Sequence, residues 1–146
     1  MNRSIHVLNG PNLNRLGLRE PEIYGHTTLV EIEAMCREAA QGDPLEFRQT
    51  NSEAQLIDWI HEACDTADGL VINPAGLSFR SIPLLDALKM FRGPLIEVHI
   101  SNIHRRDEIY RTSLVSTVAT AVIAGLGARG YVHGIMAVRD LIADRN

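Results

Sequence analysis

Residues 69–74 read Gly-Leu-Val-Ile-Asn-Pro, a short apolar run that stops abruptly at a turn-forming pair. Residues 4–11 (SIHVLNGP) repeat the same pattern. These runs lack the alternation of apolar and polar residues that a half-exposed strand shows. They therefore predict strands that are buried on both faces, as in a parallel sheet. Further strands of this kind are predicted at 45–47, 95–100 and 118–124.

Segments with helical periodicity separate these strands. They are predicted over 29–41 behind a Thr27 or Thr28 cap, from Asn51 or Ser52 to Ala63, over 80–91 and over 128–144. The apolar side of the 80–91 helix is expected to comprise Ile82, Leu85, Leu88 and Met90 or Phe91. The alternation of strand and helix predicts a single α/β domain over residues 1–146. Its expected architecture is a flavodoxin-like three-layer α/β/α sandwich around a five-stranded parallel sheet.

The composition of the 146 residues excludes several classes of protein. Hydrophobic residues make up 45%, too many for a disordered chain, and no apolar run approaches the length of a membrane span. The formal net charge of −4 gives no broad positive field for nucleic acid. No secretory signal is recognisable, and Cys36 and Cys64 both fall in predicted helices. We therefore expect free thiols and a reducing, cytoplasmic location.

The expected fold also predicts where the binding site lies. In open α/β sheets, ligands bind beyond the carboxyl ends of the strands. These ends are expected to carry the segments 9–26, 50–53, 73–81, 99–106 and 125–127. The first segment is long for a loop in a compact domain, and such loops are usually functional.

Residues 125–130 (GLGARG) match the Gly-x-Gly-x-x-Gly pattern of dinucleotide-binding proteins. That fingerprint requires a complete strand-helix-strand unit and an acidic residue about 20 positions further on. No further strand is predicted after this segment. We expect instead a tight turn where the last helix packs on the sheet.

Glu97, His99 and His104 allow three interpretations. They can be metal ligands, although zinc sites usually show tighter spacing. Alternatively, Glu97 and His99 share one face of a strand, so the carboxylate can accept a hydrogen bond from the imidazole and select its tautomer. The third interpretation is a histidine near the surface whose hydrogen-bonding groups have partners and which has no role in function.

Two groups of basic residues lie in the same segments. Arg105, Arg106 and Arg111 form either a solvated charge run or, with backbone N–H groups after Ser101, a site for a small carboxylate. Arg19 lies near Tyr24 in the first loop. Tyr24 can be a packing anchor, but a guanidinium beside it would favour a phenolate, which can abstract a proton next to a carbonyl.

Several strings together resemble one family. They are GPNLNRLGLREPEIYG at 10–25, VINPAG at 71–76, PLIEVHISNIHRRDE at 94–108 and GLGARGY at 125–131. In this order they are similar to the type II 3-dehydroquinate dehydratases, over nearly the whole chain. The resemblance implies a flavodoxin-like subunit of a homododecamer, built as a tetramer of trimers. It also implies reversible dehydration of 3-dehydroquinate to 3-dehydroshikimate, for the shikimate route or quinate catabolism, without metal or organic cofactor.

The resemblance assigns catalytic roles to five residues. Tyr24, held as a base by Arg19, would remove the proton alpha to the ketone. Asn12 would stabilise the enolate through an ordered water. His99 would protonate the departing hydroxyl, and Glu97 would orient His99.

The resemblance also assigns substrate contacts. Ser101 and the backbone N–H near Asn102 would hold the carboxylate, and Asn73 and Ile100 would contact the substrate. Further contacts fall on Arg106, which would support the positive field around the tyrosine, and Asp86, whose carboxylate would enter a neighbouring subunit's site. The loop around 18–25 would act as a lid.

The chain departs from the family at two substrate-binding positions. Phe79 stands where a histidine usually binds the substrate hydroxyls, and Tyr110 stands where an arginine usually contacts the ring diol. Two alternatives to the dehydratase therefore stay open: a related lyase for a differently oxygenated carbocyclic acid, and a non-catalytic paralogue. A flavin-binding module is disfavoured because Pro11 removes an N–H from the loop that would bind phosphate.

Overall fold

A computed structural model describes residues 3–145. Its five strands form one parallel sheet in the order β2-β1-β3-β4-β5, which confirms the predicted flavodoxin-like arrangement. The strands are β1 (Ile5–Asn9), β2 (Leu45–Gln49), β3 (Gly69–Asn73), β4 (Leu95–His99) and β5 (Ala121–Ala124). Asn9 and Asn73 pair in register at the carboxyl ends of β1 and β3.

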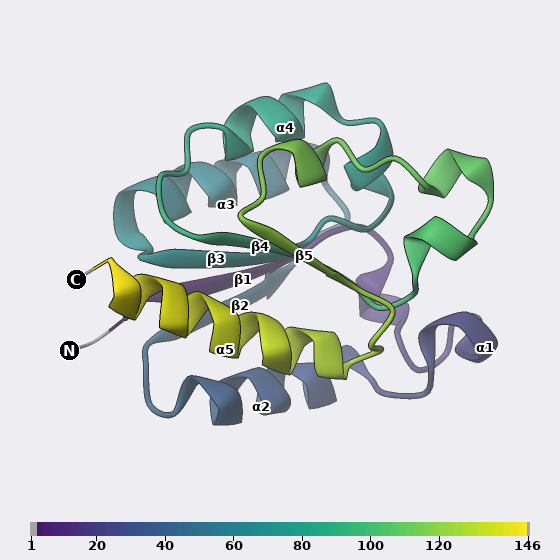
Figure 1. Ribbon diagram of the computed structural model, residues 1–146. Coiled ribbons are helices and arrows are strands. Elements are labelled where there is room, and N and C mark those ends of the chain that lie inside the picture. The colour runs from purple at the N-terminus through teal and green to yellow at the C-terminus, as the bar shows by residue number, and fades with distance from the viewer. Residues whose placement is uncertain (1–2, 146) are drawn as a thin grey trace.

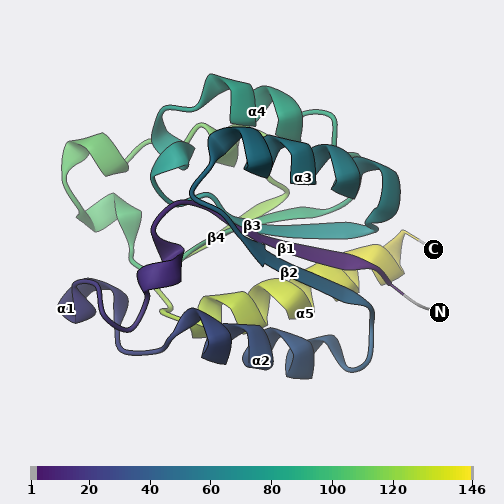
Figure 2. The same cartoon turned by 180° about the vertical axis from the view of Figure 1, so that it is seen from behind.

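Helices cover both faces of the sheet (Figures 1 and 2). One face carries α2 (Leu29–Ala40) and α5 (Arg129–Asp144), and the other carries α3 (Glu53–Thr66) and α4 (Ile82–Leu88). Each pair encloses its own hydrophobic core against the sheet. Thr28 and Ser52 cap α2 and α3 as predicted, and α3 continues past the expected end at Ala63.

The core face predicted for the fourth helix was correct only in part. Leu88 is buried as predicted and Phe91 packs against the core, but Ile82 and Met90 are 61% and 57% exposed, and Leu84 and Ala87 are buried instead. Ser81 caps α4 by accepting a hydrogen bond from the Leu84 N–H, so the helix begins later than expected. Because a helix turns by about 100° per residue, Leu84 and Leu88 share one side of α4, whereas Ile82 lies about 200° away from Leu84.

The last strand is also shorter and less buried than predicted. Residues Val115–Thr117 form a short 3₁₀ turn, and β5 begins only at Ala121. β5 is an edge strand, and Val122 is 41% exposed. An apolar run therefore did not imply burial on both faces here, because no further strand or helix covers this edge among the described residues.

The glycine pattern at 125–130 forms the predicted tight turn. Gly125 and Gly127 have φ angles of 92° and 63°, in the region that favours glycine. The Gly127 N–H donates to the Ile100 carbonyl at 3.0 Å, which ties the turn to the end of β4. Further along α5, Gly134 lets the helix lie close to the sheet, since a Cβ at this position would be only 3.2 Å from a methyl group of Val98.

The long loop after β1 contains ordered structure. It holds a 3₁₀ turn (Leu13–Arg15) and the short helix α1 (Pro21–Tyr24). Leu13 and Leu16 are buried and anchor the loop to the core. Figure 1 shows α1 beyond one end of the sheet, far from both chain termini. Among the described residues, no helix combines the length and apolarity that a membrane crossing requires.

Candidate active site

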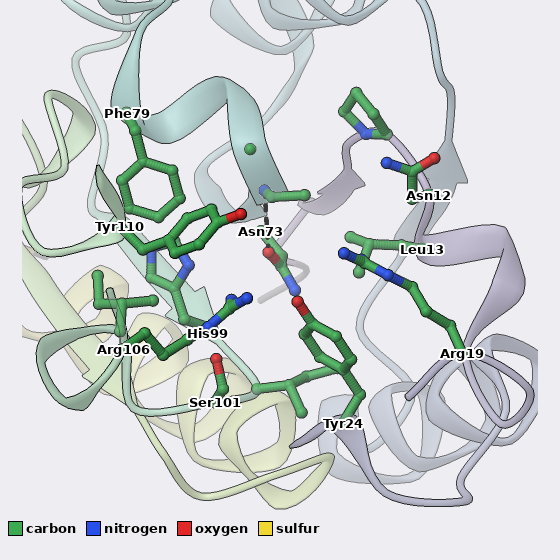
Figure 3. Close-up of a pocket in the computed structure, with 15 residues that line it drawn as sticks. Asn12, Leu13, Arg19, Tyr24, Asn73, Phe79, His99, Ser101, Arg106 and Tyr110 are labelled. Carbon is green, nitrogen blue, oxygen red and sulfur yellow. Dashed lines mark hydrogen bonds between the residues drawn. The ribbon is translucent and has the colours of Figure 1, made fainter. Parts of the chain in front are cut away.

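A cavity of about 200 Å³ lies at the carboxyl ends of the strands (Figure 3). Ten of the predicted site residues line it: Asn12, Arg19, Tyr24, Asn73, Phe79, His99, Ile100, Ser101, Arg106 and Tyr110. Three do not. Glu97 is fully buried beneath it, Asn102 lines an adjoining hollow, and Asp86 is exposed on α4. The fold thus brings most of the predicted set together.

Tyr24 ends α1 and directs its hydroxyl into the cavity (Figure 3). Two guanidinium groups lie against its ring, with Cζ of Arg19 4.5 Å and Cζ of Arg106 5.5 Å from the ring centre. Arg19 also lies 3.4 Å from the carboxylate of Glu20. The first loop therefore presents a phenol in a positively charged setting. We call residues 10–25 the base loop.

His99 occupies the end of β4, and its only acidic partner in the described chain is Glu97. The imidazole Nε2 lies 2.5 Å from Glu97 Oε2, so the predicted hydrogen bond is present. Both residues are buried, with exposed fractions of 4% and 0%. Because the carboxylate engages Nε2, the other ring nitrogen, Nδ1, is left for the cavity.

Glu97 receives three further hydrogen bonds that the sequence analysis missed. Ser113 donates to Oε2 at 2.6 Å, Ser116 donates to Oε1 at 2.6 Å, and Ser78 donates to Oε2 at 3.3 Å. Burial raises the pKa of Glu97, but the hydrogen bonds from His99, Ser113 and Ser116 outweigh burial and bring it below its ordinary value. We call the three serines the serine cradle. No local motif connects them in the sequence.

Tyr131 was also missed, and it supports the floor of the cavity. Its hydroxyl donates to Asn9 Oδ1 at 2.7 Å and accepts from Asn73 Nδ2 at 2.8 Å. Complete burial raises the pKa of Tyr131, which keeps the phenol protonated. The Asn73 Oδ1 in turn accepts a hydrogen bond from the N–H of Ala75, which adopts a positive φ of 53°. Tyr131 thereby fixes the turn that forms one side of the cavity.

Phe79 and Tyr110 form an aromatic wall on another side of the cavity. Their rings meet edge to face at 5.5 Å, and Phe79 stacks on the His99 ring at 6.0 Å. Arg106 lies 4.1 Å above the Tyr110 ring, so one guanidinium contacts both Tyr110 and Tyr24. This wall presents ring surfaces and a single phenol hydroxyl to a ligand.

The arginines after β4 do not act as one group. Arg106 lines the cavity, whereas Arg105 and Arg111 are exposed and do not line it. Arg111 instead donates from Nε to the Arg106 carbonyl at 2.7 Å. The side chain of Asn102 caps the following 3₁₀ turn by accepting from the His104 N–H. Within residues 3–145, no three His, Cys, Asp or Glu side chains are grouped to bind a metal ion.

Comparison with known proteins identifies relatives along nearly the whole chain. Residues 3–139 match the family described as dehydroquinase class II. The chain is 55% identical over 138 residues to 3-dehydroquinate dehydratase 2 of Agrobacterium fabrum, covering 93% of this chain and 92% of the relative. It is 51% identical over 143 residues to the 3-dehydroquinate dehydratase of Streptomyces coelicolor, covering 96% and 91%.

Solved structures agree with this result. A type II dehydroquinase from Propionibacterium acnes superposes with a TM-score of 0.92 at 46% identity, covering 96% of this chain and 98% of that one. A 3-dehydroquinate dehydratase-like protein from Bifidobacterium longum superposes with a TM-score of 0.73 at 32% identity, covering 98% and 99%.

Proposed function

The chain belongs to the class II dehydroquinase family, and we propose that it catalyses the reversible dehydration of 3-dehydroquinate to 3-dehydroshikimate through an enolate. It is accordingly a lyase. The observation that carries the proposal is the cavity in which the Tyr24 phenol and the His99 imidazole face the same space (Figure 3).

The first proposed step is removal of the proton alpha to the substrate ketone by the Tyr24 phenolate. The C–H bond breaks, its electron pair forms the enolate, and the proton moves to the phenol oxygen. The guanidinium groups of Arg19 and Arg106 against the ring support this role, because a nearby positive charge favours the phenolate.

The enolate requires stabilisation where its negative charge develops. We assign this role to Asn12, acting through a water molecule. Asn12 lines the cavity, and its backbone N–H donates to Asn51 Oδ1 at 2.9 Å, which fixes the turn that carries it. With these groups, the reaction is proposed to need no metal or organic cofactor.

The second step expels the C1 hydroxyl as water. His99 donates a proton to the departing oxygen, the C–O bond breaks, and the electron pair of the enolate forms the ring double bond. Glu97 keeps the imidazole oriented by its hydrogen bond to Nε2. Tyr24 then releases its proton to solvent and His99 takes up a proton from solvent, which completes the cycle.

The remaining residues bind the substrate in this proposal. Ser101 and the backbone N–H near Asn102 hold the carboxylate, Ile100 contacts the substrate, and Asn73 shapes the adjoining turn. Residues 18–25 of the base loop close as a lid and exclude water. Asp86 is proposed to complete a neighbouring subunit's site in a homododecamer, which fits its exposed place on α4. The free thiols of Cys36 and Cys64 support a cytoplasmic location.

A direct assay tests the proposal. Purified protein mixed with 3-dehydroquinate is expected to produce the conjugated enone of 3-dehydroshikimate, which absorbs in the ultraviolet. Absence of that signal with folded protein contradicts the proposal and leaves the related lyase and the non-catalytic paralogue.

The aromatic wall favours a second candidate, a related lyase for a carbocyclic acid with different ring oxygenation. Phe79 presents no hydrogen-bonding group, and the contacts of Tyr110 are a ring edge and a guanidinium. The Tyr110 phenol is the one hydrogen-bonding group of the wall, so a second substrate hydroxyl on this side would lack a partner there, which typically costs about 1–3 kcal/mol. Turnover of an analogue lacking the diol hydroxyls at a higher kcat/KM than 3-dehydroquinate would establish this candidate.

A further inference from the structure

The serine cradle surrounds a carboxylate that has no contact with solvent. Glu97 is 0% exposed, and both of its oxygens accept hydroxyl hydrogen bonds, from Ser113 and Ser78 on Oε2 and from Ser116 on Oε1. Ser78 and Ser113 also lie 2.9 Å apart, so the hydroxyls form one connected network. None of the three serines lines the cavity.

We propose that Ser78, Ser113 and Ser116 are positioning residues that keep Glu97 ionised beneath His99 and so maintain His99 as the proton donor. This inference rests on the proposed function, in which His99 protonates the leaving hydroxyl. The serines act only through Glu97, since they do not contact the cavity.

The physical need for the cradle follows from burial. A carboxylate taken out of water loses its hydration and tends to bind a proton unless other donors replace the water. Here three hydroxyls replace it. If Glu97 were protonated, it would offer His99 no negative charge, and the protonated imidazole would lose its stabilising partner.

The cradle also joins segments that are far apart in the chain. Ser78 precedes Phe79 in the turn after β3, whereas Ser113 and Ser116 follow Tyr110 in the connection to β5. The Leu114 N–H donates to the Ser78 carbonyl at 2.8 Å beside these contacts. The alternative is that the serines only hold the two segments together. The experiment must distinguish this structural role from an effect on Glu97 and His99.

The test compares Ser116→Ala and Ser113→Ala with Thr117→Ala. Thr117 lies in the same 3₁₀ turn as Ser116, but its hydroxyl donates to the Leu114 carbonyl at 2.7 Å and does not contact Glu97. Thr117→Ala therefore removes a hydroxyl from the turn without changing the cradle. Ser116→Thr is the conservative variant that retains the donor.

Two measurements are made on each variant. The first is the titration of the Glu97 carboxyl carbon by ¹³C NMR on resting enzyme, with the signal assigned by its loss in Glu97→Gln. The second is kcat and KM for 3-dehydroquinate as a function of pH. The first measurement needs no turnover, so it tests the cradle even if the proposed function fails.

Ser116→Ala and Ser113→Ala are expected to move the Glu97 titration to higher pH and to lower kcat about tenfold with little change in KM, since hydrogen bonds to charged groups are strong. Ser116→Thr should restore both values, and Thr117→Ala should change neither. The proposal is overturned if the Glu97 titration does not move. It is equally overturned if the titration moves without a fall in kcat, or if Thr117→Ala lowers kcat as much as Ser116→Ala. Ser116 is partly exposed, so its variants keep the test available should Ser113→Ala fail to fold.

Discussion

The base loop and the aromatic wall enclose the same cavity but offer a ligand different chemistry. The base loop contributes Asn12, Arg19 and Tyr24 to the cavity. These side chains carry a charge or can form hydrogen bonds to a charged group. The aromatic wall contributes Phe79 and Tyr110, which contact each other and leave little polar surface. If Tyr24 is the base and the substrate diol faces the aromatic wall, as proposed, proton abstraction and diol recognition would use different sides of the cavity.

The largest expected effect comes from removing the base. Tyr24→Phe deletes one oxygen and leaves the ring to pack against Arg19. We expect kcat for 3-dehydroquinate to fall by about 10²- to 10⁴-fold, the usual contribution of a general base. Circular dichroism and thermal unfolding should match the unaltered protein. Near-normal turnover would mean that the base loop does not supply the base.

Changing the aromatic wall should have the next largest effect, and in the opposite direction. Phe79→His and Tyr110→Arg each add a hydrogen-bond donor where substrate hydroxyls would lie. We expect kcat/KM for 3-dehydroquinate to rise about 10- to 150-fold if each hydroxyl gains a partner. If both variants only lose activity, the wall suits a ring with less oxygen on that side.

Arg19 and Arg106 both lie against Tyr24, but only Arg106 also contacts the aromatic wall. Variants of the two arginines therefore separate the two sides of the cavity. Arg19→Gln should lower kcat about tenfold, because the guanidinium nearer to the Tyr24 ring is lost. Arg106→Gln should lower kcat less, since it lies further from Tyr24, but should also raise KM by loosening Tyr110. If Arg19→Gln and Arg106→Gln changed kcat and KM to the same extent, the two arginines would not have different roles.

Asp86 tests whether a neighbouring subunit adds polar groups that the aromatic wall lacks. We expect a solution mass that matches a dodecamer of 16.2 kDa subunits, measured by light scattering. Asp86→Ala should lower kcat/KM several-fold, in line with the loss of a hydrogen bond to a charged group. A stable, fully active monomer would remove Asp86 from the site.

The smallest expected effect lies outside both sides of the cavity, at His6 near the amino end of β1. His6 is 3% exposed, and its Nδ1 has no hydrogen-bond partner among the described residues. Burial, and to a lesser extent the charge of Arg48, lowers the pKa of His6. As the pH falls below about 6.5, the unfolded chain binds a proton that the folded protein does not, so stability decreases.

His6→Leu should reduce this acid sensitivity without changing catalysis. The loss of unfolding free energy between pH 7.5 and 5.5 is measured by urea denaturation at each pH. His6 contributes at most about 1.4 kcal/mol per pH unit to it. The variant should lose less stability over this interval and keep its kcat at pH 7.5. An unchanged pH dependence would show that His6 is not the group responsible.

Several features could be predicted because they depend on neighbouring residues. The contact between Glu97 and His99 follows from their spacing, since residues two apart on a strand share a face. The place of the 9–26 loop beside the cavity follows from its position at the carboxyl end of a parallel strand. The turn at Gly125 and Gly127 follows from residues that tolerate positive φ.

Other features depend on contacts between distant segments. The exposure of Ile82 on α4 and of Val122 on β5 was not predicted, because burial depends on which elements lie alongside. The serine cradle and Tyr131 were not predicted at all. Their hydrogen bonds join residues 16 to 122 positions apart, and no local pattern records such pairs.

The order of strands and helices, the parallel sheet and the end of the sheet where the cavity lies could all be predicted from the amino-acid sequence. These features follow from hydrophobic periodicity and turn chemistry, which act over a few residues. The packing of Phe79 on Tyr110 and the grouping of three serines around Glu97 became visible only in the folded chain. Both depend on the strand order β3-β4-β5, which brings the loops after β3 and β4 together.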